Sequence, residues 1–185
     1  AKTVIAVIKE NGYGLGLKTE YEILRDLGVE YFALTSAEEA LALRRYGATE
    51  PILLLSPYND LQSVEALAAE DITQMLGHSS QVELYRQVYE NLGRKPKVHL
   101  AIDTGMGRYG FPWDKLPSDL TALTAAVEIT GTYSHFNNAE KMTAIQLERF
   151  KQALAALRQM GIEPGLTHMS NSAAMMTIGD GGLDA

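Results

Sequence analysis

The chain has 185 residues, a formal net charge of −7 and 46% hydrophobic residues, which is ordinary for a single globular domain with a sizeable core. The acidic balance argues against nucleic acid as a partner, and the apolar runs are too short to cross a membrane. No cysteine occurs, which excludes disulfides and thiolate metal sites and fits a cytoplasmic protein.

Apolar and β-branched runs predict seven strands, most of them followed by a helix with an apolar stripe. The strands are expected at 4–8, 31–35, 51–55, 72–76, 97–102, 127–133 and 166–169. Helices are expected at about 21–28, 36–47, 61–68, 80–92, 147–161 and 172–178. Ser36 with Glu39, and Ser80 with Glu83, have the spacing of a capping box, which predicts helix starts there.

Successive strand-then-helix units without hairpins indicate parallel pairing through right-handed crossovers. A doubly wound sheet and a (β/α)8 TIM-type barrel both satisfy this pattern. The barrel is favoured because motifs follow at least four different strands, whereas an open sheet concentrates its site at one switch point. A complete barrel takes about 250 residues, so residues 1–185 are expected to form one barrel domain, truncated before or within strand eight.

Lys9 stands at the carboxyl end of the first expected strand, 4–8, which is predicted to be buried on both faces. Ligands of parallel α/β folds bind at that end, and partial burial would free the amine to attack a carbonyl, such as that of an aldehyde cofactor. Tyr13 and three glycines follow. A solvated strand end is the simpler alternative, and a dinucleotide fingerprint is disfavoured because Leu17 stands where its third glycine belongs.

Three further motifs follow later strands. Arg108, in the glycine-rich segment 103–111, could hold a carboxylate or remain a surface arginine. His135 could be a core histidine or a catalytic one. Ser172 begins the last expected helix, where a phosphate can bind or where the residue is an ordinary cap. His78 and His99 belong to no motif and lie near no acidic cluster in the sequence, so no metal site is predicted.

These segments resemble the motifs of the alanine racemases. The family's K-A-N-A-Y-G-H-G is matched at Lys9, Asn11, Tyr13, Gly14 and Gly16, with departures at Glu10, Gly12 and Leu15. Residues 103–111 closely match D-T-G-M-G-R-x-G-F, residues 134–140 resemble T-H-F-A-x-A-D/E, and residues 168–173 match H-x-x-N-S-A.

The resemblance implies a barrel that binds pyridoxal 5'-phosphate (PLP) covalently through Lys9. It assigns the cofactor phosphate to Tyr13 and Ser172, with Asn171 beside them and His168 in support. It assigns Arg108 to the phenolic oxygen of the cofactor and to the substrate carboxylate, with Met106 lining the substrate pocket. His135 is expected to pack against the pyridine ring, so that Lys9, Arg108 and His135 form the catalytic set.

The implied activity is the interconversion of L- and D-alanine, which supplies D-alanine for peptidoglycan. Racemisation needs two bases, and in the family the second is a tyrosine from the C-terminal β-domain of a partner subunit, which implies a homodimer. That domain and an arginine after strand eight are absent from this chain, so the chain alone is expected to be impaired. Ala101 replaces a lysine that is carbamylated in many members, so another group or an ion would have to orient Arg108.

Three alternatives remain open at this stage. The chain could be a PLP-carrying barrel similar to the PLP-homeostasis proteins. These proteins are not expected to keep D-T-G-M-G-R together with H-x-x-N-S-A, which argues against this alternative. It could be a racemase of another amino acid, because the family pattern is broken near the site. It could also be an inactive folding unit.

Overall fold

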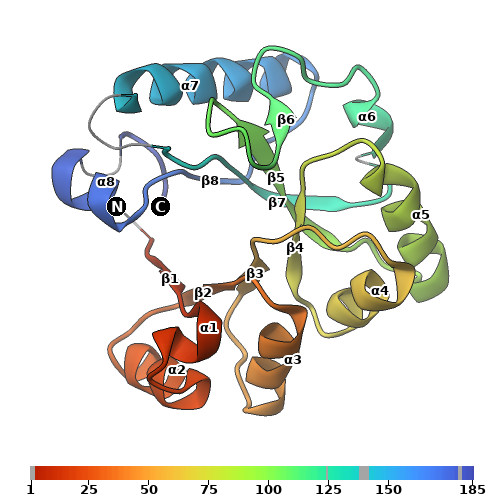
Figure 1. The fold of residues 1–185 in the computed structure, drawn as a ribbon. Coiled ribbons are helices and arrows are strands. Elements are labelled where there is room, and N and C mark those ends of the chain that lie inside the picture. The colour runs from red at the N-terminus through yellow and green to blue at the C-terminus, as the bar shows by residue number, and fades with distance from the viewer. Residues whose placement is uncertain (1–2, 124, 138–141, 179–180) are drawn as a thin grey trace.

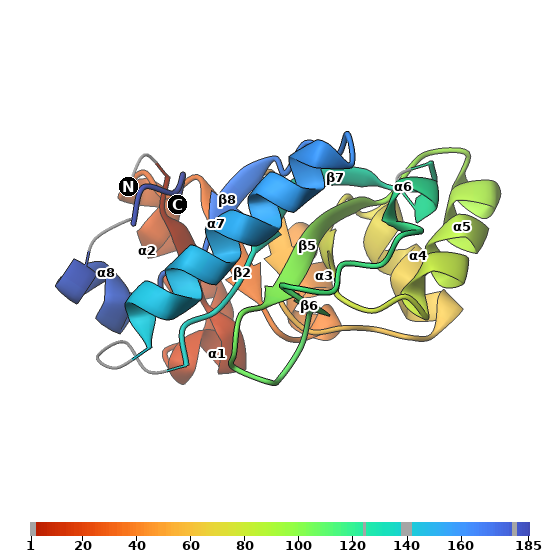
Figure 2. The ribbon, with the colours of Figure 1, turned by 90° about the horizontal axis from the view of Figure 1, so that it is seen from above.

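The structure is a computed structural model that describes residues 3–123, 125–137, 142–178 and 181–185. Within these ranges a curled parallel sheet is covered on its outer face by helices (Figure 1 and Figure 2). The strands are β1 (Ile5–Val7), β2 (Tyr31–Leu34), β3 (Ile52–Leu54), β4 (Thr73–Leu76), β5 (Lys97–Asp103), β6 (Phe111–Pro112), β7 (Glu128–Tyr133) and β8 (Leu166–His168). The helices are α1 (Lys9–Tyr13), α2 (Leu17–Asp26), α3 (Ala37–Arg45), α4 (Leu61–Ala69), α5 (Gln81–Leu92), α6 (Leu120–Leu123), α7 (Thr143–Gln159) and α8 (Ser172–Ile178).

The strands pair in chain order, β1-β2-β3-β4-β5-β7-β8, and every pairing is parallel. The order never reverses, so the sheet has no switch point and is of the barrel type. The seven predicted strands and the α/β barrel class are therefore confirmed. The two-residue β6 beside β5 and the short α6 were not predicted, because both lie in the irregular segment between β5 and β7.

The last described residues lie between the two ends of this sheet. Asp184 accepts a hydrogen bond from the Thr3 N–H through its backbone oxygen, at 3.2 Å, and donates its own N–H to the Thr167 carbonyl of β8, at 2.9 Å. Its side-chain Oδ2 also accepts the N–H and hydroxyl of Thr167, at 3.0 and 2.8 Å. Asp184 thus connects β8 to the start of β1 at the place where the sequence predicts an eighth strand to begin.

The prediction that the first strand is buried on both faces is wrong. Val4 is 53% exposed and Val7 37% exposed, whereas Ile8 is fully buried. β1 ends the path of paired strands, and Val4 and Val7 line an open cavity instead of a filled barrel interior. The strand also ends at Val7, so Lys9 follows it as the first residue of α1.

Two apolar clusters fill the space between the sheet and the outer helices. One packs β2 and β3 against α2, α3 and α4, with Phe32 and Ile52 fully buried. The other packs β5 and β7 against α5 and α7, with Val98 and Phe150 fully buried. Both clusters lie on the helical side of the sheet, so the carboxyl ends of the strands stay free to carry polar side chains.

The helix starts agree only in part with the predicted capping boxes. The Ser36 hydroxyl accepts the Glu39 N–H at 3.4 Å, as a cap of α3 should. The Glu39 carboxylate does not return to Ser36 but accepts the Asn11 N–H. The box at Ser80 is wrong: the Ser80 hydroxyl pairs with His78 Nδ1 at 2.8 Å, while Glu83 binds Arg86. No helix in the described ranges is both long and apolar enough to cross a membrane.

Candidate functional site

A cavity of about 750 Å³ opens at the carboxyl ends of β1, β5, β7 and β8. The side chains singled out from the sequence all line it: Lys9, Tyr13, Met106, Arg108, His135, His168, Asn171 and Ser172. They come from four separate strand ends, as the barrel predicts. The fold therefore brings these residues together, while the role of each stays a prediction.

Lys9 and Tyr13 enter the cavity from the two ends of an unusual turn. Residues 10–13 all have positive φ, between 49° and 60°, which makes one turn of left-handed helix. This conformation keeps the segment compact, with Leu15 donating its N–H to the Gly12 carbonyl at 2.9 Å. The predicted glycine loop is thus an ordered turn, and its two cavity-lining side chains are four residues apart.

The loop of residues 103–111, which carries Arg108, is shaped by Asp103 and by its glycines. Asp103 Oδ1 accepts the N–H groups of Gly105 and Gly107, at 2.9 and 3.0 Å, and so folds the loop back over the end of β5. A Cβ at Gly110 would lie 2.7 Å from the Asp103 nitrogen, so only glycine fits there. The loop presents Arg108 to the cavity, with its guanidinium 5.7 Å from the centre of the Tyr109 ring.

Gln146 of α7 joins this loop to the segment that carries His135. Its fully buried amide donates to the Thr104 hydroxyl and to the His135 carbonyl, both at 3.2 Å, and accepts the Asn137 N–H at 3.0 Å. The Thr104 and Ser134 hydroxyls pair at 2.8 Å beside it. One side chain thereby fixes the ends of β5 and β7 relative to each other.

The protonated form of His135 is disfavoured. Its pKa lies below the ordinary value because the ring is partly buried, and because the positive charges of Arg108 and Lys9 further oppose protonation. The coupling shows that the three side chains share one electrostatic environment. The later part of the motif around His135, including Glu140, lies outside the described residues.

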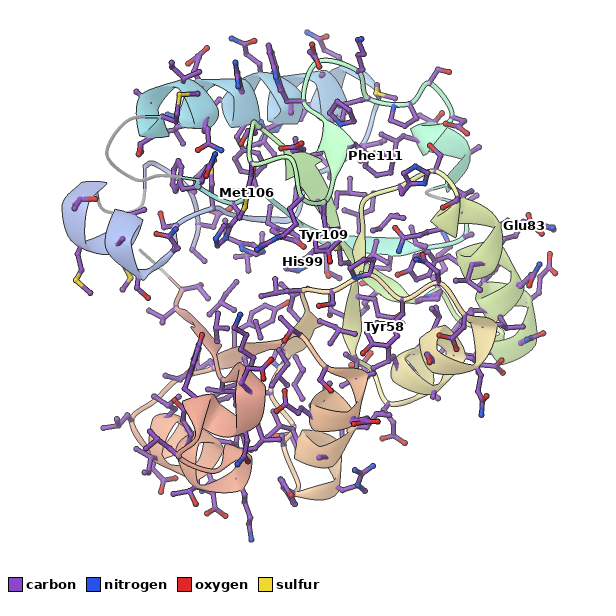
Figure 3. All side chains as sticks on the ribbon, viewed as in Figure 1. Tyr58, Glu83, His99, Met106, Tyr109 and Phe111 are labelled. Atoms are coloured by element: carbon purple, nitrogen blue, oxygen red, sulfur yellow. The ribbon has the colours of Figure 1, made fainter. Side chains whose placement is uncertain are left out.

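A chain of three polar rings crosses the inside of the sheet below the cavity. The Tyr31 hydroxyl lies 3.1 Å from His99 Nε2, and His99 Nδ1 lies 2.9 Å from His168 Nε2. His168 also stacks on Tyr133, with the ring planes 5° apart. Figure 3 places His99 near the middle of the molecule, with Met106 and Tyr109. His168 is therefore held by its neighbours on both sides.

The protonated forms of His99 and His168 are both disfavoured. Burial lowers the pKa of His99 to about 4, and burial together with the neighbouring His99 also lowers the pKa of His168. Unfolded histidines titrate near 6.5, so the unfolded state binds more protons below that pH. Stability from these two groups is present above about pH 6.5 and is lost as the pH falls toward 4.

We therefore expect the free energy of unfolding to decrease on acidification from pH 6.5 to 4.5, by up to about 1.4 kcal/mol per pH unit for each neutral histidine. Urea unfolding across this range measures the slope. His99→Gln should make the slope shallower, whereas His78→Gln, at an exposed histidine, should leave it unchanged. Equal slopes in the wild type and both variants would contradict this account.

The start of α8 has a different cap from the one expected. Asn171 Oδ1 accepts the Ala174 N–H at 2.9 Å, so Asn171 caps the helix and Ser172 is its first residue. Asn171 also donates to the Phe136 carbonyl at 3.4 Å, which joins the segments after β7 and β8. The Ser172 hydroxyl is consequently not used as the cap and lines the cavity.

Ala101 packs in an apolar environment at the base of the cavity. It is 2% exposed and clusters with Met75 and Tyr133. Burial raises the pKa of Tyr133, although the charge of Arg108 acts in the opposite direction. The residues that cluster with this position are therefore apolar or aromatic, and Ala101 itself also lines the cavity.

Sequence reasoning missed the residues that support the site from behind: Tyr31, Glu39, His99 and Gln146. His99 had a usable signal, because it alternates with Ala101 along β5 and so shares the inner face of the sheet. Gln146 also had a signal, because a polar residue within the apolar stripe of α7 indicates a buried hydrogen-bonding role. In the described ranges, no three His, Cys, Asp or Glu side chains gather in a group that could hold a metal ion.

The comparisons with known sequences all identify the same family. The family described as "Alanine racemase, N-terminal domain" matches residues 1–184. The alanine racemase of Symbiobacterium thermophilum is 35% identical over 183 residues, and alanine racemase 2 of Caldanaerobacter subterraneus is 32% identical over 188. These matches cover 95% and 98% of this chain but 48% of each relative, so the chain spans about half the length of the curated relatives it matches.

Solved structures give the same result for the fold. An alanine racemase of Clostridium difficile 630 in complex with cycloserine superposes with a TM-score of 0.88 at 28% identity, covering 98% of this chain and 52% of that one. The alanine racemase of Bacillus anthracis with bound L-Ala-P has a TM-score of 0.88 at 29% identity, covering 99% and 49%.

Proposed function

The chain belongs to the alanine racemase family through its N-terminal domain, and we propose that it forms the cofactor-binding part of a PLP-dependent enzyme that interconverts L- and D-alanine. The observation that carries the proposal is the gathering of Lys9, Arg108 and His135 around one cavity. A small amino-acid substrate, a homodimer and a cytoplasmic location are parts of the same proposal.

The residues of the cavity fit the cofactor chemically. An aldehyde needs an amine, which Lys9 offers, and a phosphate needs donors, which the hydroxyls of Tyr13 and Ser172 supply together with the first amides of α8. The positive charges of Lys9 and Arg108 favour anions in the cavity, although the whole chain is acidic. When bound, PLP supplies an electron sink for the α-carbon of an amino acid.

Each side chain has a distinct task in this proposal. Arg108 holds the substrate carboxylate with its guanidinium fork, which a flexible point charge cannot imitate. Lys9 removes or returns a proton at the α-carbon on one face of the substrate. Burial and the charges of Arg108 and Lys9 lower the pKa of His135, which favours a neutral ring that packs against an aromatic ring without a third positive charge. The ring of His168, which contacts His99 and stacks on Tyr133, lines the base of the cavity.

The ligands of the solved neighbours support a substrate of alanine's size. The Clostridium difficile structure is a complex with cycloserine, and the Bacillus anthracis structure contains L-Ala-P. The decisive experiment incubates the full-length protein with PLP and L-alanine and measures D-alanine by chiral chromatography. We expect D-alanine to accumulate to equal amounts of both enantiomers. Cofactor binding without conversion of alanine or any other amino acid would instead support a PLP-carrying protein.

A further inference from the structure

The turn between Lys9 and Tyr13 is strained and needs contacts that hold it. The φ and ψ angles are 56° and 51° at Glu10, 54° and 47° at Asn11, and 60° and 46° at Gly12, followed by φ 49° at Tyr13. Three of these four residues carry a Cβ, and a Cβ disfavours the left-handed helical region because it crowds the following carbonyl oxygen. Such a turn persists only when the surrounding structure determines it.

Asn11 is the centre of the contacts within the turn. Its side-chain Oδ1 accepts the Leu17 N–H at 3.0 Å, and its carbonyl accepts the Gly16 N–H at 2.9 Å. Both partners lie only a few residues further along the chain. These bonds close the turn on itself and onto the start of α2, but they do not fix it to the rest of the sheet.

Glu39 provides a link to the next strand-and-helix unit. The Asn11 N–H donates to Glu39 Oε1 at 2.6 Å, across 28 residues of sequence. A carboxylate acceptor makes this a short, charge-assisted hydrogen bond, which is about twice as strong as a neutral one. The backbone of Glu39 is itself fixed, because its N–H donates to the Ser36 hydroxyl at the start of α3.

The opposite side of the turn is packed by α2. A Cβ at Gly12 would lie 2.5 Å from Glu20 Oε2 and 3.1 Å from Glu20 Cβ, so α2 lies close against this part of the turn. The turn therefore lies between α2 and α3, and Glu39 is the α3 side chain that binds its backbone. Tyr13 ends the turn and Lys9 precedes it, and both line the cavity.

We propose that Glu39 is a positioning residue that holds the left-handed turn of residues 10–13 through the Asn11 N–H, and thereby sets Lys9 and Tyr13 at their places in the cavity. Glu39 contributes no group to the cavity itself and acts through the turn. The inference rests on the proposed function only where it concerns PLP, because the hydrogen bond from Asn11 to Glu39 is present in the protein without cofactor.

The test compares Glu39→Ala with two matched variants in the full-length protein. Glu39→Gln keeps an oxygen acceptor at the same place, and Glu38→Ala removes the neighbouring, exposed carboxylate. Alanine is the best helix former, so α3 should remain intact, and the exchange rates of its amides check this. Hydrogen exchange of residues 10–17 is measured without cofactor, and the dissociation constant for PLP is measured by absorbance.

We expect Glu39→Ala to speed exchange in residues 10–17 and to weaken PLP binding, each by about 10- to 100-fold, the effect of losing a hydrogen bond to a charged group. Glu39→Gln should recover part of both losses, because its amide oxygen is a neutral and therefore weaker acceptor, and Glu38→Ala should match the wild type. Unchanged exchange in Glu39→Ala would show that Glu39 does not stabilise the turn. Faster exchange with unchanged PLP affinity would show that the turn does not position Lys9 and Tyr13 for the cofactor. If the wild type itself bound no PLP, the proposed function would fail, while the exchange data would still decide whether Glu39 holds the turn.

Discussion

Lys9→Arg should lower alanine racemisation by the full-length protein by about 10²–10⁴-fold, the usual loss when a general base is removed. Arginine keeps the positive charge that the cavity presents to anions, but its guanidinium stays protonated and cannot serve as a base or bond to an aldehyde. The loss would therefore come from the chemistry of the amine and not from its charge. Steady-state rates in both directions, from L- and from D-alanine, measure it.

Lys18→Arg is the matched control for this experiment. Lys18 lies on α2, is 58% exposed at its side chain, and pairs with Glu22 on the same helix. Its replacement should leave the rate unchanged. Near-normal racemisation by Lys9→Arg, in a variant that unfolds at the same urea concentration as the wild type, would remove Lys9 from the proposed mechanism.

Arg108→Lys should reduce kcat/KM for alanine by about 10- to 100-fold, which corresponds to losing a hydrogen bond to a charged group. The charge is conserved, so the loss reports the guanidinium geometry, which can bind a carboxylate through two parallel hydrogen bonds. The loop that carries Arg108 is shaped by Asp103 and the glycines, so the substitution should not alter the backbone. Kinetics over a range of alanine concentrations separates the effects on kcat and KM.

Arg45→Lys on α3, at an exposed arginine remote from the cavity, serves as the comparison. It should leave both kinetic constants at the wild-type values. If Arg108→Lys behaved in the same way, Arg108 would be a surface residue of a flexible loop, which is the alternative that the sequence leaves open.

The fold was predictable because its signals are local. Each buried parallel strand is a short apolar run, such as Ile52–Leu54, and each outer helix has an apolar stripe, so the order of the elements follows from the sequence. The burial of β1 was not predictable in this way. Val4 and Val7 have the composition of a buried strand, but their exposure depends on which strands lie beside β1 in the folded sheet.

The motifs predicted which residues would line one cavity, but not the contacts that hold them there. Glycines at positions such as Gly110 are explained by close backbone approach, which a glycine-rich motif indicates in advance. The supporting contacts join residues far apart in the chain, such as Gln146 with Thr104 and His99 with His168. No local pattern encodes such a pairing, because it depends on how the strands are placed next to one another.

The capping box at residues 36–39 illustrates the same limit. Local spacing correctly identifies Ser36 as the cap of α3, and it also predicts that the Glu39 carboxylate returns to the Ser36 backbone. In the folded chain the carboxylate binds the Asn11 N–H instead. A strained turn with a backbone donor outcompetes the local partner, and no signal within residues 36–39 reveals this.

Covalent attachment of PLP to Lys9 is the central claim, and borohydride reduction followed by peptide mapping tests it most directly. The full-length protein is incubated with PLP, reduced with sodium borohydride, digested and analysed by mass spectrometry. The account predicts a pyridoxyl group on the peptide that contains Lys9, and its loss in Lys9→Arg. A pyridoxyl group on a different lysine, or none on folded protein, would contradict it.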